Sequence, residues 1–211
     1  MRVDVANIED LEEIVALHIS NYDPNELSIF LGEPYIRCFY KIIIKSKEID
    51  ILVVREESDK VICISVAFYR YLMFRIIYKK EIAKLLLFDI LKSCFYFSGW
   101  IRIIQILKRL KHDILKNIPG ESHNHHLGSL IIDKHYRDNI HAVILFTKVL
   151  RKNFLELIGK GTFWASANIN NDKSIALLQS LGLRKLYIVN AFPLDIQVLI
   201  GGNLNKGKHE D

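Results

Sequence analysis

The stretch that decides the fold is N-I-N-N-D-K-S-I-A-L-L-Q-S-L-G-L, from Asn168 to Leu183. The residues before it, 162–167, predict a strand, and apolar residues at helical spacing over 172–181 predict a helix. Asn171 stands where a helix-capping side chain belongs, and Gly182 stands where a left-handed helix stop belongs. The stretch therefore predicts a strand, a tight turn and a capped helix in direct succession.

A second informative stretch lies upstream, L-I-I-D-K-H-Y-R-D-N-I-H-A, from Leu130 to Ala142. The nearly continuous apolar run 127–132 is typical of a buried central strand, and residues 140–157 have the spacing of a helix. The short polar loop 133–139 joins them. Backbone N–H groups at the start of such a helix have no partner within it, so they favour a bound anion such as phosphate.

Upstream of both stretches the pattern alternates helices and strands. A polar turn over 56–60 separates two apolar runs, 50–54 and 61–69, which predicts an antiparallel hairpin. Helical spacing over 8–19 and 35–45 predicts two helices before it. Together these elements predict an α/β fold with a mixed, mostly antiparallel central sheet flanked by helices.

The two quoted stretches resemble the signature segments of the GNAT superfamily of N-acetyltransferases. The family's pyrophosphate loop reads Arg or Gln, two residues, Gly, one residue, then Gly or Ala, and Arg137 and Ala142 match its first and last positions. In the second segment the residues in register with the family pattern are Asn168, Asn171, Ser174, Ile175, Leu177, Leu181 and Gly182. The resemblance covers residues 121–192 well and 1–70 loosely.

This resemblance implies the domain organisation. We expect a single GNAT-like domain over 1–200, a basic, helical insertion at 71–118, and a flexible tail over 201–211. It also implies acetyl-CoA as the acyl donor. The cofactor-binding residues that it implies are Leu130, Ile131, Ile132, Arg137, Asp138, Asn139, Ile140, His141, Ala142, Asn168, Asn171 and Ser174.

Two positions depart from the family pattern. Ile140 stands where the family has the glycine that permits close phosphate approach, and Leu178 stands where a tyrosine commonly serves as the general acid. Two hypotheses follow. The first is an N-acetyltransferase that acts on the amine of a small molecule, and the second is a GNAT-fold protein that binds without catalysing.

The histidine-rich run 121–126 supplies the candidate general base. In the family a base on the central strand often deprotonates the amine, while a backbone N–H of that strand polarises the thioester carbonyl. His126 immediately precedes that strand, and an imidazole titrates near neutral pH. A solvated loop with incidental histidines is the alternative.

The acceptor pocket of this fold is usually built from the first helices and the loop between them. The substrate-binding candidates in that region are Tyr22, Glu33 and Tyr35. A carboxylate there could hold a cationic amine, and a tyrosine could stack on a sugar. Packing aromatics in a solvated loop would give the same pattern.

The composition restricts the function classes. The chain has 211 residues, half of them hydrophobic, a net charge of +5 and three cysteines without metal-ligand spacing. We therefore expect reduced thiols, no metal site, a cytoplasmic location and no secretory signal in the mixed, charged segment 1–10. Nucleic-acid binding is not expected, because no recognition motif accompanies the basic residues.

The basic segment 71–118 needs its own explanation. It carries ten Lys or Arg residues against three acids, with apolar residues at helical spacing between them. Packing on its own domain or on a second subunit, giving a homodimer, is one interpretation, and peripheral contact with a membrane surface is another. Long insertions at this place also resemble those of GNAT proteins in surface-polysaccharide pathways, which points to an amino sugar as an acceptor.

Overall fold

The computed structural model describes residues 1–22, 29, 32–46, 49–69, 71–93, 100, 104, 126–158, 162–180, 183–191 and 195–203. In chain order the elements are β1 (Arg2–Val5), η1 (Ile8–Asp10), α1 (Leu11–Asn21), α3 (Glu33–Lys45), β2 (Ile49–Arg55), β3 (Val61–Phe68), α4 (Tyr71–Ser93), β4 (His126–Ile132), α6 (Lys134–Arg137), α7 (Ile140–Ile158), β5 (Thr162–Asn168), α8 (Asp172–Ser180), β6 (Arg184–Ala191) and β7 (Asp195–Asn203). Strands and helices fall where the sequence pattern predicts them, apart from the differences given below.

The strands of the described residues form a seven-stranded sheet in the order β1-β2-β3-β4-β5-β7-β6. Every neighbouring pair is antiparallel except β4 and β5, which run parallel. The predicted mixed, mostly antiparallel sheet is therefore confirmed.

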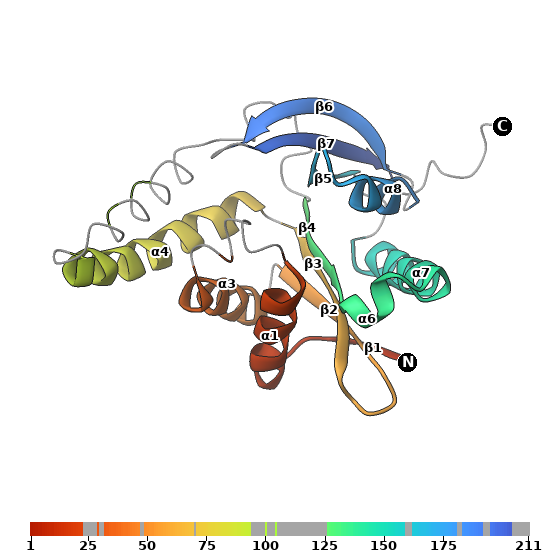
Figure 1. Cartoon of the computed structure of the whole chain (residues 1–211), viewed down its shortest axis with the longest axis horizontal. Helices are drawn as coiled ribbons and strands as arrows, with labels where there is room; N and C mark the ends of the chain where they lie inside the picture. Colours follow the sequence, from red (N-terminus) through yellow and green to blue (C-terminus); the bar gives the residue numbers. More distant parts are fainter. Residues whose placement is uncertain are drawn as a thin grey trace.

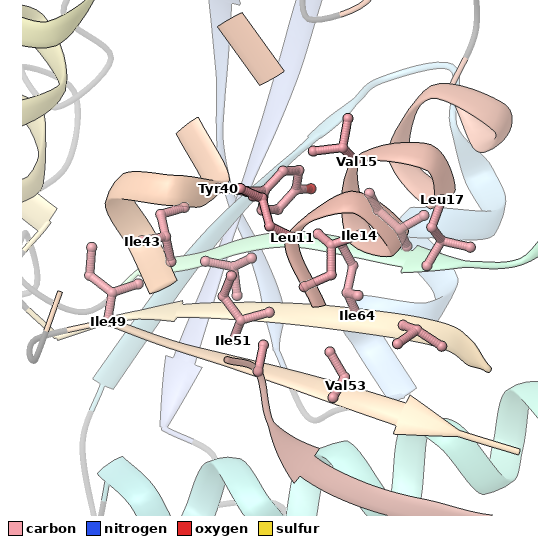
Figure 2. Packing of buried hydrophobic residues seen from close by; sticks show 14 of the residues in the cluster. Leu11, Ile14, Val15, Leu17, Tyr40, Ile43, Ile49, Ile51, Val53 and Ile64 are labelled. Carbon is pink, nitrogen blue, oxygen red and sulfur yellow. The ribbon is translucent and has the colours of Figure 1, made fainter. Parts of the chain in front are cut away.

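Helices cover both faces of the sheet (Figure 1). Helices α1, α3 and α4 lie on one face, where a core cluster joins residues such as Ile14, Tyr40 and Ile64. Helices α6, α7 and α8 lie on the other, where residues such as Phe146 and Ile175 pack against the sheet. We call the first face the α1/α3 face and the second the α7/α8 face. Figure 2 shows the α1/α3 cluster, with the ring of Tyr40 reaching from α3 toward α1.

A buried ion pair fixes the start of α1 to the sheet. Arg55, at the end of β2, bonds through Nη2 to Oδ1 of Asp10 at 2.5 Å, and both residues are buried. Asp10 also closes a capping box with Asn7, whose side chain accepts from the backbone of Glu9. Burying a charge is costly unless it is paired, so this contact determines where the helix begins.

The insertion is helical in the part that the structure describes. Helix α4 extends over 23 residues from Tyr71 to Ser93, and its inner face buries Phe74, Ile82 and Leu86. The rest of the segment predicted as an insertion, apart from residues 100 and 104, lies outside the described residues. Among the described helices, none combines the length and the apolar character that a membrane crossing requires.

The predicted boundary of the tail at residue 201 is wrong by three residues. Strand β7 continues to Asn203, and Gly201 and Gly202 pair with Trp164 and Phe163 of β5. The two glycines carry no side chain that would mark a strand in the sequence, but their backbone groups complete the ladder. Residues 204–211 lie outside the described part of the chain.

Candidate functional site

The site begins where the two parallel strands of the sheet separate. Among the described residues, β4 and β5 share one paired position, His126 with Trp164. Beyond that pair, the residues from Leu127 to Ile132 face those from Ala165 to Asn168 without a ladder between them. The backbone edge of β4 is thus left open on its β5 side toward its C-terminal end.

Aromatic side chains close the narrow end of this opening. The His126 ring stacks on Trp164 with centroids 3.8 Å apart, and on Phe68 with centroids 5.5 Å apart. Gly128 lies beneath Phe68, because a Cβ built on it would come within 2.5 Å of the Phe68 ring. The glycine therefore allows the ring to lie flat against β4.

A bulge in β4 follows His126 along the strand. Ser65 of β3 pairs with Leu130, while Ala67 pairs with Leu127, so β4 has one residue more than β3 between these pairs. Such a bulge disrupts the ladder and re-aims side chains and backbone groups. The extra length falls at Gly128 and Ser129, which puts irregular backbone at the edge that β5 leaves open.

The loop after β4 is anchored to the β2–β3 hairpin. Asp133 caps α6 by accepting from the His135 backbone at 3.0 Å, and it receives Lys60 Nζ at 3.1 Å. Tyr136 donates its hydroxyl to Glu56 Oε2 at 2.5 Å. These contacts fix the loop that leads into α7.

The first turn of α7 presents the backbone groups that the resemblance assigns to a pyrophosphate. Asn139 Oδ1 accepts from the backbone N–H groups of His141 at 3.0 Å and Ala142 at 3.1 Å. The Arg137 guanidinium donates to Asn21 at the end of α1, to Oδ1 at 2.9 Å and to the backbone O at 3.1 Å. A phosphate bound at the N–H groups of His141 and Ala142 would therefore take the place of the Asn139 side chain.

The second motif closes the same opening from β5. Asn168 Oδ1 accepts from the Asn170 backbone at 2.9 Å, and Asn171 Oδ1 caps α8 by accepting from the Ser174 backbone at 3.0 Å. The predicted helix cap at Asn171 is confirmed. An exposed ion pair, Lys173 Nζ with Asp138 Oδ1 at 3.2 Å, links the starts of α7 and α8. The two sequence motifs thus meet in space.

The remaining predicted cofactor residues divide between the core and the surface. Leu130 and Ile132 pack on the α7/α8 face, whereas Ile131 is buried on the α1/α3 face. Ala142 is buried in the core. Ile140 is 68% exposed, so the position that lacks the family glycine presents an apolar side chain to solvent. None of these placements tests cofactor binding, which stays a prediction.

The expectation that His126 titrates near neutral pH is wrong. Burial in its aromatic stack lowers the pKa of the imidazole to about 3, because the charged form loses its hydration there. His126 is therefore a neutral and weakly basic group under ordinary conditions. Its role as general base stays a prediction, and His123 and His125 lie outside the described residues.

The three predicted substrate-binding residues lie in different surroundings. Tyr22 is half-buried and stacks on His18 with centroids 4.3 Å apart. Tyr35 is only 3% exposed and belongs to the core. Glu33 is exposed and accepts from Arg37 at 2.5 Å. Tyr22 thus packs on a buried side chain of α1. Residues 23–28, which follow it in the loop between the first helices, lie outside the described residues.

Sequence reasoning missed a buried polar contact on the α1/α3 face. His18 Nδ1 of α1 lies 2.8 Å from the hydroxyl of Tyr40 on α3. His18 is 5% exposed and Tyr40 is not exposed at all. The only signal in the sequence was a polar residue on the apolar side of each helix, since α1 and α3 contribute one member each.

The sheet that splays at its one parallel pair, with two capped helices at the opening, is the architecture of the GNAT acetyltransferases. No family model matches the sequence, and no curated protein matches it. Solved structures do resemble it over nearly the whole chain.

A variant of spermidine N-acetyltransferase SpeG from Vibrio cholerae is 12% identical, with a TM-score of 0.55, over 98% of this chain and 96% of that one. A GNAT-family acetyltransferase from Bacillus cereus is 14% identical, with a TM-score of 0.54, over 96% of both chains. The ribosomal-protein-S18-alanine N-acetyltransferase from Escherichia coli is 10% identical, with a TM-score of 0.55, over 96% and 93%. The protein therefore has the GNAT fold.

Proposed function

We propose that the protein is an N-acetyltransferase that transfers an acetyl group from acetyl-CoA to the primary amine of a small molecule. The observation that carries this proposal is the opening between β4 and β5, which has one paired position at its narrow end and two helix N-termini at its wide end. An extended thiol-bearing arm can add hydrogen bonds to an open strand edge, and its phosphates can bind the helix N-termini.

The residues at the wide end suit the donor. The backbone N–H groups of His141 and Ala142 can turn from the Asn139 side chain to phosphate oxygens. Arg137 and Lys173 bring positive charge to the same place, and Lys173 already neutralises Asp138. Asn168, Asn171 and Ser174 line the β5 side of the opening by our proposal. Acetyl-CoA itself supplies the thioester, whose acetyl group is activated toward amines.

The reaction that we propose balances as follows. The neutral amine nitrogen forms a bond to the acetyl carbon, the carbon–sulfur bond breaks, the amine loses one proton and the thiolate gains one. The bulge at Gly128 and Ser129 offers backbone N–H groups for the developing oxyanion. Leu178 is buried in the core, at the position where the resemblance has a tyrosine, so we expect the thiolate to take its proton from solvent.

The proposed reaction requires an acceptor with a primary amine, and three kinds of amine are worth testing first. Two of the similar structures are a spermidine N-acetyltransferase and a ribosomal-protein-S18-alanine N-acetyltransferase. The likeness of the insertion to those of surface-polysaccharide proteins adds an amino sugar. A first panel therefore contains spermidine, glucosamine and a short peptide that begins with alanine.

Calorimetric titration with acetyl-CoA and with desulfo-CoA tests the donor site. We expect micromolar binding by the wild-type protein and weaker binding by Asn168→Ala, because Asn168 shapes the turn at the end of β5. Asn7→Ala is the matched control, since it removes a similar cap at the far side of the sheet. If neither ligand binds the wild-type protein, the enzyme proposal fails.

The second candidate is a GNAT-fold protein that binds without catalysing and contacts an anionic membrane surface. Helix α4 favours it, because Ile76, Ile77 and Leu87 are exposed beside the exposed Lys79 and Lys80. Flotation with phosphatidylserine vesicles would test it, with Lys79→Glu/Lys80→Glu as the variant and phosphatidylcholine vesicles as the control. Binding to both vesicle types alike, or to neither, would remove this candidate.

The remaining properties are proposals as well. We expect a cytoplasmic protein with reduced thiols, and sedimentation equilibrium would decide between a monomer and a homodimer. In the described part of the chain, no group of His, Cys, Asp and Glu side chains is arranged to hold a metal ion.

A further inference from the structure

We propose that a row of three stacked rings, Phe68, His126 and Trp164, forms the end wall of the donor site and limits the donor to a short acyl group. This inference rests on the acetyltransferase proposed above, and it names the residues that decide which acyl group is transferred. We call these three residues the ring row. Trp164 is its specificity-determining member, and Phe74 of α4 is a positioning residue behind it.

The ring row crosses three strands at one level. Phe68 of β3 pairs with His126 of β4, and His126 pairs with Trp164 of β5. Paired residues on neighbouring strands project to the same face of a sheet, and Phe68 belongs to the core of the α1/α3 face. The ring planes of successive members are 19° and 24° apart, so the rings stand side by side as a stack. The stack therefore spans β4 and β5 at the narrow end of the opening.

The chain order gives the direction in which a donor would lie. Helix α7 follows the C-terminal end of β4, helix α8 follows that of β5, and the two strands are parallel. Both helix N-termini therefore belong to the wide end, whereas His126 is the first residue of β4. A donor whose phosphates bind at the helix N-termini would extend its thiol arm toward the ring row. Its acyl group would then be the part nearest the rings.

The length of the arm decides how near the acyl group comes. The seven residues of β4, His126–Ile132, span about 20 Å. The pantetheine arm has about twelve bonds between the phosphate oxygen and the sulfur, which equals about four extended residues or about 14 Å. An arm that starts level with Ile132 brings its sulfur level with Gly128, which leaves about 6 Å to the ring row. An acetyl group in van der Waals contact with a ring fills about that distance, and a hexanoyl group needs about 5 Å more.

The wall is apolar and is held from behind. Burial lowers the pKa of His126 to about 3, so its ring is neutral near pH 7, and Trp164 is buried beside it. Phe74, in the first turns of the predicted insertion, packs on Phe68 with centroids 4.6 Å apart. On the other side Phe68 lies against Gly128, where a Cβ would come within 2.5 Å of the ring. The ring row can therefore yield to a longer acyl chain only by displacing α4 or by breaking the stack.

The first test compares acetyl-, butyryl- and hexanoyl-CoA by calorimetric titration of the wild-type protein, and it needs no acceptor. We expect hexanoyl-CoA to bind at least about tenfold more weakly than acetyl-CoA, because the longer chain overpacks the closed end. An open end would instead tighten binding about fourfold for each methylene that it buries. Affinity that stays level or rises from acetyl- to hexanoyl-CoA would overturn this inference and leave the acetyltransferase proposal intact.

The second test shortens the wall with Trp164→Leu. The ratio of the dissociation constants of hexanoyl-CoA and acetyl-CoA should fall about tenfold, because the smaller side chain relieves the overpacking. This ratio does not depend on the fraction of folded protein, since both ligands bind the same folded molecules. Trp100→Leu is the matched control, because Trp100 is exposed, and it should keep the wild-type ratio. An unchanged ratio in Trp164→Leu would overturn the assignment, and Trp164→Phe is measured in the same way should the leucine variant not fold.

The contribution of α4 is tested with Phe74→Leu. This variant keeps an apolar side chain but withdraws the ring that supports Phe68. It should lower the same ratio, by less than Trp164→Leu does, while the dissociation constant of acetyl-CoA stays unchanged. A loss of thermal stability with no change in the ratio would overturn the role of Phe74.

A spectroscopic test reports the contact directly. The chain has two tryptophans, Trp100 and Trp164, so Trp100→Leu leaves Trp164 as the sole source of tryptophan fluorescence. Acetyl-CoA and butyryl-CoA should change this emission more than desulfo-CoA, which has no acyl group. Equal changes with all three ligands would mean that the acyl group does not reach the ring, and this also overturns the inference.

The outcomes separate the two proposals. A wild-type protein that binds neither desulfo-CoA nor any acyl-CoA would overturn the proposed function and the ring row's role with it. A wild-type protein that binds acetyl-CoA, but shows no penalty for the longer chain, would overturn the role of the ring row alone.

Discussion

The two faces of the sheet build their halves of the site by different means. On the α7/α8 face the contacts are backbone groups at helix starts, capped by Asn139 and Asn171, which are close in sequence to the groups that they cap. On the α1/α3 face the contacts are single buried side chains from different helices, His18 of α1 and Tyr40 of α3. The contacts of the first half join residues close in sequence, and water can replace them. The contacts of the second half are buried and form only when the whole fold is in place.

This difference has a consequence for mutations. A side chain in the α1/α3 half can be lost only at the expense of packing and of buried polar partners. A cap in the α7/α8 half can be lost at a small cost, because solvent or a phosphate takes its place.

Removal of the buried acid at the start of α1 should have the largest effect. Asp10→Ala leaves Arg55 buried beside weaker partners, at 3.5 Å from Asp4 and 3.7 Å from Glu13. We expect a loss of about 3 kcal/mol in the free energy of unfolding, measured by urea denaturation. Glu12→Ala, which removes an exposed partner of Arg37, is the control and should cost less than about 1 kcal/mol. Equal losses in the two variants would show that the buried ion pair stabilises the fold no more than the exposed one.

A methyl group at the bulge should be the next most disruptive change. Gly128→Ala forces the Phe68 ring away from β4, because the added Cβ would lie 2.5 Å from it. We expect a loss of about 2 kcal/mol in stability. Phe68→Leu in the same chain should recover part of it by vacating the space, whereas an additive loss in the double variant would show that the ring is not the obstacle.

Acid should destabilise the protein through its buried histidines. The folded pKa of His126 is about 3, below the ordinary value of 6.5, so between these values the unfolded state binds more protons than the folded state. This contribution is therefore complete above pH 6.5 and is lost as the pH falls toward 3, by about 1.4 kcal/mol per pH unit. His126→Phe keeps the stack and removes this slope. Parallel stability profiles for wild type and variant between pH 7.5 and about 5 would contradict the burial of the imidazole.

The cap of α7 should matter least. Asn139→Ala exposes the N–H groups of His141 and Ala142 and should cost about 1 kcal/mol in stability. Under the proposed function the affinity of this variant for acetyl-CoA, measured by calorimetry, should not fall, because a bound phosphate would take the position of the side chain. Asn171→Ala is the matched cap on α8 and should weaken binding. A loss of affinity in Asn139→Ala would instead make that side chain a ligand.

The sequence predicted the fold well where the signal was local. The hairpin, the central strand and the cap at Asn171 each depend on a few neighbouring residues, and each was found. The end of β7 was missed because Gly201 and Gly202 enter the ladder through backbone groups that no side chain marks.

The candidate site was predictable on one face only. The loop at Arg137 and the turn at Asn168 could be predicted, since helix starts have a sequence signature. The pKa of His126 was not, because it depends on Phe68 and Trp164, which pack around it only in the folded chain. His18 and Tyr40 are 22 residues apart, and nothing in the sequence relates one to the other.

The single pair between β4 and β5 divides the sheet into two half-sheets, β1 to β4 and β5 to β7. They are joined at His126 and Trp164. Hydrogen exchange should therefore report two units that open separately, with the slowest amides in β2 and β3. A ligand that occupies the opening would then contact both half-sheets and couple their opening. Its binding would be seen first as a common opening free energy for the two half-sheets in hydrogen exchange, before any product is formed.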